Sequence, residues 1–379
     1  MSGRGINRCP DALPPAVTSS LFESLSVGAV TLPNRVVMAP LTRMRATPPD
    51  DVPNALIAEY YRQRASAGLI VSEGTQISPI GKGYMDTPGI YSDAQVEGWR
   101  RVTDAVHAEG GLIAAQLWHV GRVSHESFHD GALPVSASAL PYRNRTTIKG
   151  ADGLPQRADC PTPRALSVEE IAATVEDYAR AARNAREAGF DLVEIHGAHG
   201  YLIHQFLGRA SNHREDEYGG SQENRARFAL EVVDAVTAAW SADRTGIRIS
   251  PQGSFNGLEE DDLPMALYLA GEFSARGLAF LHLSEPDWAG GPVLEDGFRK
   301  ELRAAFDGTI IGAGSYTVAK AERLLDLDLI DAAAFGRTFI ANPDLPERLR
   351  TGAPLNEPVP ATFYGGDAVG YTDYPALGA

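Results

Sequence analysis

Short apolar runs alternate with helical patterns along most of the chain. Eight such runs cover residues 36–40, 69–73, 112–117, 190–196, 246–250, 279–284, 309–313 and 331–336. Short apolar runs bounded by turn residues are typical of buried strands, and strands that alternate with helices form parallel sheets. Eight of these units predict an α/β fold of the closed (β/α)8 type, a TIM barrel.

One αβ unit shows the pattern most clearly. Ser167-Val-Glu-Glu forms a capping box, and apolar or small residues then recur at helical spacing as far as Ala185. Gly189 ends the predicted helix, and the strand at 190–196 follows directly. Helix, glycine and strand therefore come in the order that a barrel repeats.

Three segments depart from this rhythm. Residues 27–32, with Gly28 among them, predict an N-terminal β-hairpin that plugs the barrel. The interval at about 121–164 is rich in Pro, Ser, Asn, Gly and Arg and too long for a plain loop, so we expect a capping insertion after the third strand. Residues 1–20 predict a flexible extension, which leaves 21–379 as one barrel domain. An open doubly wound sheet is the competing architecture, but no Gly-x-Gly-x-x-Gly opens an early βα unit.

Composition narrows the class of protein. The 379 residues include 49 Asp and Glu against 34 Lys and Arg, and the resulting charge of −15 argues against nucleic acid as a partner. The two cysteines are too few for a disulfide framework and fit a reducing compartment. No run approaches the roughly 20 apolar residues of a membrane span, and the N-terminus has no apolar signal core. We therefore expect a cytoplasmic protein without a membrane partner.

Polar side chains follow the fourth predicted strand closely. His196, His199 and Tyr201 lie within six positions of one another at its end, where barrels place their functional residues. Two neutral imidazoles can donate hydrogen bonds to one carbonyl or nitro oxygen while a phenol supplies a proton. Each residue alone could have a structural role. His204 could also join the two histidines around zinc, although no other strand end offers a clear acidic or cysteine ligand.

Other strand ends carry groups that suit a polar heterocycle. Thr42 follows the first strand, while Gln116 and Trp118 end the third. Hydroxyl and amide groups match a ring with alternating donors and acceptors, such as isoalloxazine. Arg248 lies within the fifth strand, where a buried guanidinium requires an anion or an electron-rich ring. An internal salt bridge is the alternative for this arginine.

The last two strands end in glycine-rich turns. Gly312-Ala-Gly-Ser-Tyr follows the seventh strand, and Phe335-Gly-Arg ends the eighth. Many barrels bind phosphate at this place through glycine amides and a helix N-terminus, and Arg337 adds a fork-shaped donor. The glycines could instead serve tight turns alone. The pattern predicts a phosphorylated ligand.

Several longer motifs then identify a family. They are N-R-V-V-M-A-P-L-T-R at 34–43, E-Y-Y-R-Q-R-A-S-A-G-L-I at 59–70, A-A-Q-L-W-H at 114–119, Y-G-G-S-Q-E-N-R-A-R-F at 218–228, A-F-G-R at 334–337 and F-Y-G-G at 363–366. With them, the chain resembles the old yellow enzyme family from about Leu21 to Leu377. Within the family it resembles the bacterial branch that contains pentaerythritol tetranitrate reductase, N-ethylmaleimide reductase and morphinone reductase.

The resemblance implies an FMN-dependent ene-reductase with ping-pong kinetics. Such an enzyme takes hydride from NADPH or NADH and then reduces an α,β-unsaturated carbonyl or nitro compound, with nitrate esters and nitroaromatics as further acceptors. The alternative is a redox-inactive, phosphate-binding barrel with aldolase or isomerase chemistry, which would need a lysine at a strand end. A flavin-binding regulatory or storage protein would not need the His-His-Tyr set. The resemblance implies no metal and either a monomer or a homodimer.

The resemblance also implies roles for residues. Thr42 would bind the flavin O4, Gln116 the pyrimidine edge and Arg248 the N1/O2 region. His196 and His199 would hold the acceptor oxygen, and Tyr201 would protonate the α carbon after hydride reaches the β carbon. The remaining expected cofactor residues are Pro40, Gly74, Gly314, Gly336 and Arg337, and the remaining expected acceptor residues are Tyr84, Trp118 and Tyr364.

A few positions depart from the family's pattern. Gly74 stands where relatives often have Ala, and Gly197 stands between the histidines where Ser is expected. The stretch Gly208-Arg-Ala and Trp288 are also unusual. These departures predict an altered acceptor pocket and leave FMN binding in place. The sequence leaves open the choice between NADPH and NADH, the native acceptor and the stereochemistry.

Overall fold

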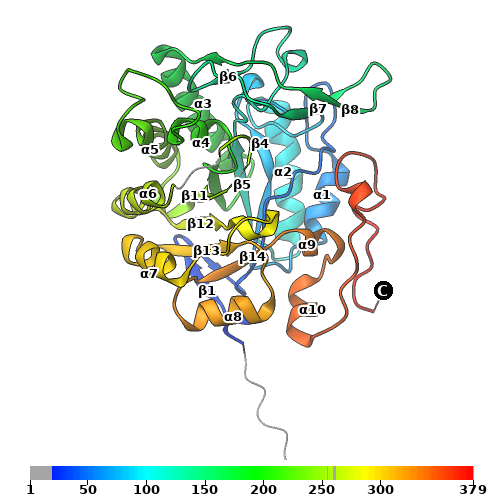
Figure 1. Ribbon diagram of the computed structural model, residues 1–379. Coiled ribbons are helices and arrows are strands. Elements are labelled where there is room, and N and C mark those ends of the chain that lie inside the picture. Colours follow the sequence, from blue (N-terminus) through cyan, green and yellow to red (C-terminus); the bar gives the residue numbers. More distant parts are fainter. Residues whose placement is uncertain (1–18, 254, 259–261, 379) are drawn as a thin grey trace, which may run out of the picture.

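Eight parallel strands close into a barrel in the computed structural model, which describes residues 19–253, 255–258 and 262–378 (Figure 1). All eight predicted strands are present, and the last pairs with the first, so the TIM-barrel prediction is confirmed. In barrel order the strands are β3 (Val36–Met38), β4 (Leu69–Gln76), β5 (Ile113–Trp118), β10 (Leu192–His196), β11 (Thr245–Ile249), β12 (Phe280–Ser284), β13 (Thr309–Ala313) and β14 (Ala332–Phe335).

Helices cover the outside of this barrel (Figure 1). The side chain of Ser167 accepts a hydrogen bond from the Glu170 amide, and the Glu170 side chain bonds back, so the predicted capping box starts α3. A second capping box, of Ser92 and Gln95, starts α2. The helices are α1 (Ala55–Arg62), α2 (Asp93–Ala108), α3 (Val168–Glu187), α4 (Leu202–Leu207), α5 (Gln222–Ala239), α6 (Leu263–Ala275), α7 (Asp296–Ala305), α8 (Val318–Asp326), α9 (Arg337–Ala341) and α10 (Leu345–Thr351).

A hairpin closes the N-terminal end of the barrel. Strands β1 (Leu25–Val27) and β2 (Val30–Leu32) pair in antiparallel fashion. Val27 and Leu32 are fully buried among interior side chains of the barrel strands. Gly28, between the strands, has a φ of +51°, and a Cβ there would lie 1.9 Å from the Asp243 carbonyl oxygen, so the turn requires glycine. The predicted plug is confirmed.

The segment at about 121–164 forms its own small structure beside the barrel. Its hairpin joins β7 (Arg145–Lys149) to β8 (Pro155–Asp159) and stands at the top right of Figure 1. The backbone of Thr147 accepts a hydrogen bond from the Met85 amide at 2.9 Å, which ties the hairpin to the loop after β4. Of the expected extension 1–20, residues 1–18 lie outside the described residues, so the division of the chain at residue 20 stays a prediction.

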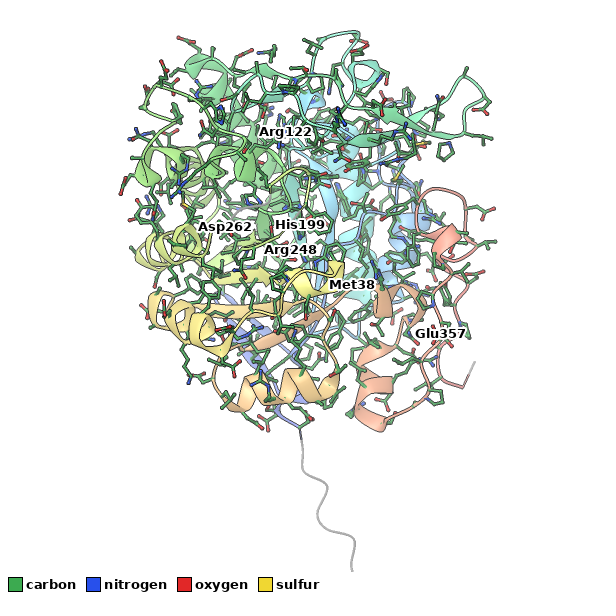
Figure 2. The ribbon with its side chains drawn as sticks, in the orientation of Figure 1. Met38, Arg122, His199, Arg248, Asp262 and Glu357 are labelled. Carbon is green, nitrogen blue, oxygen red and sulfur yellow. The ribbon has the colours of Figure 1, made fainter. Side chains whose placement is uncertain are left out.

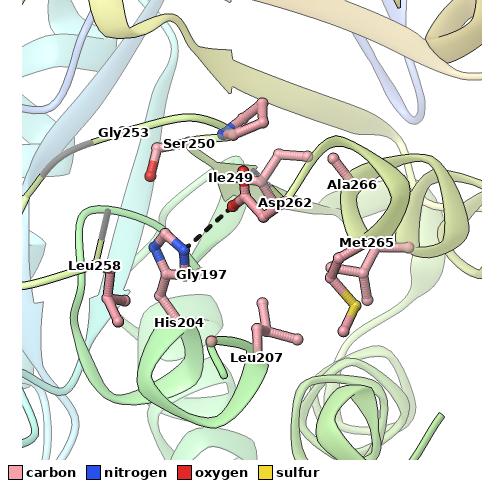
Figure 3. Close-up of a pocket in the computed structure, with 13 residues that line it drawn as sticks. Gly197, His204, Leu207, Ile249, Ser250, Gly253, Leu258, Asp262, Met265 and Ala266 are labelled. Carbon is pink, nitrogen blue, oxygen red and sulfur yellow. Dashed lines mark ion pairs between the residues drawn. The ribbon is translucent and has the colours of Figure 1, made fainter. Parts of the chain in front are cut away.

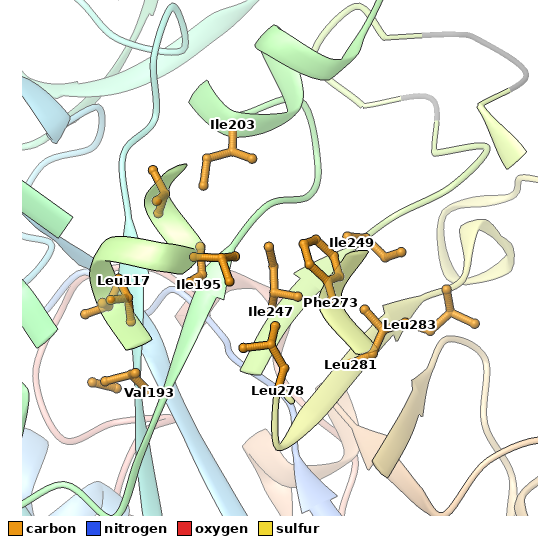
Figure 4. Packing of buried hydrophobic residues seen from close by; sticks show 14 of the residues in the cluster. Leu117, Val193, Ile195, Ile203, Ile247, Ile249, Phe273, Leu278, Leu281 and Leu283 are labelled. Atoms are coloured by element: carbon orange, nitrogen blue, oxygen red, sulfur yellow. The ribbon is translucent and has the colours of Figure 1, made fainter. Parts of the chain in front are cut away.

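The main core lies between the strands and the helices. In Figure 4, the outward side chains of β10, β11 and β12 pack against Ile203, Phe273 and Leu278. Because side chains alternate along a strand, the residues between them point into the barrel. The alternation on β10, β11 and β12 therefore turns a small set of polar side chains inward, namely Glu194, His196, Arg248, His282 and Ser284. Among the described helices, none is both long and apolar enough to cross a bilayer.

Candidate active site

A cavity of about 940 Å³ opens where the barrel strands end. This volume lies in the range of small-molecule and cofactor sites. Figure 2 places His199 and Arg248 near the centre of the barrel, and both side chains line the wall of the cavity. The structure brings the following predicted site residues to this one cavity: Pro40, Thr42, Tyr84, Gln116, Trp118, His196, His199, Tyr201, Arg248, Gly314, Gly336, Arg337 and Tyr364.

Gly74 is the predicted site residue that does not line the cavity. It lies on β4 opposite Gln116, next to a register shift in the pairing with β5. A Cβ at this position would lie 2.4 Å from the Cε3 atom of Trp118. Glycine here therefore leaves room for the Trp118 ring, and direct contact between Gly74 and the cofactor stays a prediction.

The turn after β10 presents both histidines. The Gly197 amide donates a hydrogen bond to the Arg248 carbonyl at 2.9 Å, and the chain then turns through His199 and Gly200, with φ values of +56° and +71°. A Cβ on Gly200 would lie 2.6 Å from the Phe255 carbonyl oxygen, so this step of the turn requires glycine. The centres of the His196 and His199 imidazole rings lie 5.4 Å apart, and the two ring planes form an angle of 88°.

Both imidazoles are neutral. Burial, reinforced by the positive charge of Arg248, holds the pKa of His196 and of His199 well below the usual range. The Nδ1 atom of His196 accepts a hydrogen bond from the Ala198 amide at 3.3 Å, which places its proton on Nε2. The Nε2 atom of His199 lies 2.9 Å from the Ser284 hydroxyl oxygen. Ser284 was not among the predicted site residues, although its position at the end of β12 could have indicated it.

Aromatic side chains form one wall beside the histidines. The Tyr201 ring contacts the Trp118 ring edge-on, with 4.9 Å between the ring centres. The Tyr84 ring stacks on Trp118, with 5.6 Å between the ring centres. The two tyrosine hydroxyls are 3.1 Å apart. Burial raises the pKa of Tyr201 to about 12, so its phenol keeps its proton at neutral pH. The wall therefore offers a proton donor next to the two imidazoles.

Arg248 is a buried, positively charged side chain on the cavity wall. Burial lowers the pKa of Arg248 to about 10, and the nearby Glu194 carboxylate opposes this fall, so the guanidinium stays charged. In the described part of the chain, Arg248 makes no direct salt bridge, and the Glu194 carboxylate acts on it only from a longer distance. Its Nε atom is buried and finds no hydrogen-bond partner among the described residues. A buried, charged donor of this kind requires an acceptor from a ligand.

Gly314, Gly336 and Arg337 line the same cavity. Asp287 accepts a hydrogen bond from the Ser315 amide at 2.9 Å and fixes the turn after β13. The Arg337 guanidinium lies 5.8 Å from the centre of the Trp288 ring, and the centre of the His199 ring lies 6.0 Å from it, so Trp288 is near both residues. A ligand with hydrogen-bond acceptors near Arg248 and an anionic group near Arg337 would bind both guanidinium groups. FMN has this layout, and the residues present fit it.

His204 takes a different place from the other two histidines. Its Nδ1 atom accepts a hydrogen bond from the Gly200 amide at 3.2 Å, and its Nε2 atom lies 3.5 Å from Asp262 (Figure 3). It lines a separate cavity of about 20 Å³, together with Gly197 and Gly208. Within the described ranges, no group of three or more His, Cys, Asp or Glu residues could hold a metal. The zinc alternative therefore has no geometric support.

Fold and site together define a flavin-dependent oxidoreductase built on a (β/α)8 barrel. Residues 20–356 match the model of the NADH:flavin oxidoreductase / NADH oxidase family, and the chain belongs to this family. It is 43% identical to 12-oxophytodienoate reductase 2 of Arabidopsis thaliana, covering 94% of this chain and 96% of that one. It is 46% identical to chanoclavine-I aldehyde reductase of Penicillium roqueforti, covering 94% and 96%.

Solved structures agree with this assignment. The chain superposes on morphinone reductase in complex with tetrahydroNAD with a TM-score of 0.91, at 54% identity over 94% of this chain and 98% of that one. For the old yellow enzyme homologue of Zymomonas mobilis, the TM-score is 0.87 at 44% identity over 94% and 100%. The protein is thus an FMN-dependent enzyme of the old yellow enzyme type that uses NAD(P)H to reduce activated alkenes. The aldolase or isomerase alternative is not favoured.

Proposed function

We propose that the 940 Å³ cavity holds FMN and, above it, first the nicotinamide and then the acceptor, in a ping-pong cycle. The convergence of His196, His199 and Tyr201 on one cavity wall carries this proposal. Thr42, Gln116 and Arg248 would hold the ring of FMN, and Gly314, Gly336 and Arg337 its phosphate. When bound, FMN supplies a two-electron carrier that accepts and returns hydride.

His196 and His199 bind the acceptor by its carbonyl or nitro oxygen. Because both rings are neutral, each can donate one hydrogen bond without adding a charge to the site. Two such donors draw electron density toward the oxygen and make the β carbon of a conjugated double bond electron-poor. The acceptors that fit are therefore α,β-unsaturated carbonyl and nitro compounds.

Tyr201 supplies the proton that completes the reduction. Its pKa of about 12 keeps the hydroxyl protonated until the α carbon of the acceptor gains electron density. Tyr84, at 3.1 Å, can donate its own hydrogen bond to the Tyr201 oxygen and so direct the Tyr201 proton away from itself. Trp118 and Trp288 both line the cavity and so limit the width of the acceptor pocket.

The rim of the cavity favours NADPH over NADH. Arg143, Arg145 and Arg157 line it from the capping segment. Arg143 is exposed and, within the residues that the structure describes, makes no hydrogen bond or ion pair. Arg145 is paired with Asp159 at 2.8 Å, so Arg143 is the fork that offers a local positive charge to the additional phosphate of NADPH in a chain of net charge −15.

The visible spectrum of the purified protein tests the proposal. We expect a yellow protein that bleaches when NADPH is added without oxygen and regains its colour when 2-cyclohexenone follows. A protein that cannot be loaded with FMN would contradict the cofactor assignment. Bleaching without recovery would keep the cofactor and reject the enone as acceptor, and the same titration would then be made with a nitroalkene.

A further inference from the structure

Four polar side chains form a buried layer inside the barrel, directly beneath the cavity. Gln116, Glu194, Arg248 and His282 come from the adjacent strands β5, β10, β11 and β12, and none is more than 7% exposed. Gln116 and Arg248 also line the cavity, whereas Glu194 and His282 do not. Further into the barrel, Ala114, Leu192, Phe280 and Ile311 belong to a buried apolar cluster. The layer therefore separates the apolar interior from the cofactor site.

Glu194 uses both of its carboxylate oxygens within this layer. Oε1 accepts a hydrogen bond from Nε2 of Gln116 at 2.7 Å, and Oε2 lies 2.6 Å from Nδ1 of His282. Burial acts to raise the pKa of Glu194, but His282, Arg248 and Gln116 together hold it below its ordinary value. Burial also lowers the pKa of His282. The carboxylate is therefore ionised. The Nε2 atom of His282 is buried and has no hydrogen-bond partner among the described residues, which disfavours a second proton on the ring, so the negative charge resides on Glu194.

The contact with Glu194 fixes the amide of Gln116. A carboxylate can only accept hydrogen bonds, so the amide nitrogen of Gln116 must face Glu194. This leaves the Oε1 atom of Gln116 as an acceptor for a ligand in the cavity. The N–H group on the pyrimidine side of an isoalloxazine ring is a donor of the matching kind.

We propose that Glu194 is a positioning residue that sets the reduction potential of bound FMN through Arg248 and Gln116, without touching the cofactor. This inference rests on the FMN site proposed above. Hydride brings two electrons and one proton, so the cofactor becomes more negative by one charge unit. Arg248 stabilises that added charge, and the ionised Glu194 beside it opposes the effect. Glu194 therefore keeps the potential lower than Arg248 alone would make it.

A lower potential acts in opposite directions on the two half-reactions. It makes reduction of FMN by NADPH less favourable and transfer of hydride to the alkene more favourable. A residue that only supported the barrel would weaken both half-reactions together when it is changed. The sign of the two effects therefore distinguishes the proposed role from a structural one.

The variant Glu194→Gln tests the proposal in the FMN-loaded enzyme. Glutamine removes the charge but can still accept from Gln116 and donate to His282. We expect the ratio of reduced to oxidised FMN at a fixed potential to rise about tenfold, which is about 30 mV for a two-electron couple. Visible spectra taken against a reference dye give this ratio. Reduction by NADPH should become faster, and reoxidation by 2-cyclohexenone slower.

Two matched variants serve as controls. Glu194→Asp keeps the charge, and His282→Asn keeps a neutral donor to the carboxylate, so both should retain a potential near that of the wild type. An FMN-loaded Glu194→Gln enzyme with the wild-type potential would overturn the proposal. So would a His282→Asn enzyme shifted as far as Glu194→Gln. If Glu194→Gln does not fold, Glu194→Met, also uncharged, answers the same question. A wild-type protein that binds no FMN would instead contradict the proposed function.

Discussion

The Ser284 hydroxyl oxygen lies 2.9 Å from Nε2 of His199, joining the end of β12 to the turn that follows β10. The His199 ring is neutral and carries one proton. When the hydroxyl donates to Nε2, that proton resides on Nδ1. Ser284 can therefore select the nitrogen of His199 that donates to the acceptor, which makes it a candidate site residue outside the acceptor-binding pair.

Replacing Ser284 with alanine should weaken the binding of phenol, a ligand that offers one oxygen to the histidines. Without the hydroxyl, either tautomer of His199 is allowed, and the loss should be about fivefold, the scale of one hydrogen bond. Titration of the FMN-loaded enzyme with phenol, followed in the visible spectrum, measures it. Ser284→Thr keeps the hydroxyl and should bind phenol as the wild type does. An unchanged affinity in Ser284→Ala would refute this role.

Tyr201→Phe should slow alkene reduction by about 100-fold or more, the usual range for a lost proton donor. Reduction of FMN by NADPH should stay nearly unchanged, because the phenol acts only in the second half-reaction. Stopped-flow measurement of each half-reaction separates the two. Tyr142→Phe, which removes a hydroxyl that contacts Cys160, is the control. Equal slowing of both half-reactions in Tyr201→Phe would rule out the assignment.

His196→Ala should reduce the affinity for phenol or an enone about tenfold, because one of two oxygen donors disappears. Equilibrium titration of the oxidised enzyme gives the dissociation constant directly. His107→Ala removes a half-exposed imidazole that pairs with Asp191 on the surface, and it should leave the affinity as it is. Wild-type affinity in His196→Ala would show that the acceptor oxygen binds elsewhere.

Arg143→Ala should raise the KM for NADPH about fivefold and leave the KM for NADH unchanged, because a charge-assisted contact to the additional phosphate is lost. Steady-state rates with both nicotinamides measure the difference. Arg186→Ala, on the exposed face of α3, removes the same charge far from the cavity rim and should change neither constant. If the KM values for NADPH and NADH increased equally, Arg143 would contact a group that both nicotinamides carry, and the prediction would be wrong.

Glu73 should make stability depend on pH. Burial raises its pKa to about 7, from an ordinary value of 4.5. Below pH 4.5 the Glu73 carboxyl is protonated in the folded and in the unfolded protein. Between about pH 4.5 and 7 it is ionised in the unfolded chain but still protonated in the folded protein. The free energy of unfolding therefore falls as pH rises. Between pH 4 and pH 8, the free energy of unfolding of the wild type should fall by on the order of 3 kcal/mol relative to that of Glu73→Gln. Chemical denaturation of both FMN-loaded proteins tests this, and equal pH slopes would contradict it.

Local pattern was enough to predict the barrel. Apolar runs of strand length, the capping box at Ser167 and the stop at Gly189 each act over a few residues, so they can be read without knowing what packs against them. The positions of His196 and Gln116 at strand ends, and of Arg248 within a strand, followed from the same pattern. Parallel strands in a barrel bring their carboxyl ends together, which is why these residues line one cavity.

The sequence by itself thus determined the barrel, the hairpin plug and most of the cavity's residues, together with the family. Only the tertiary structure decided how those residues are held. It paired Ser284 with His199 and turned His204 toward Asp262, across 85 and 58 positions of sequence. It also placed Glu194 between Gln116 and His282. These contacts depend on which strands are neighbours and on which face each side chain takes, and closure of the barrel fixes both.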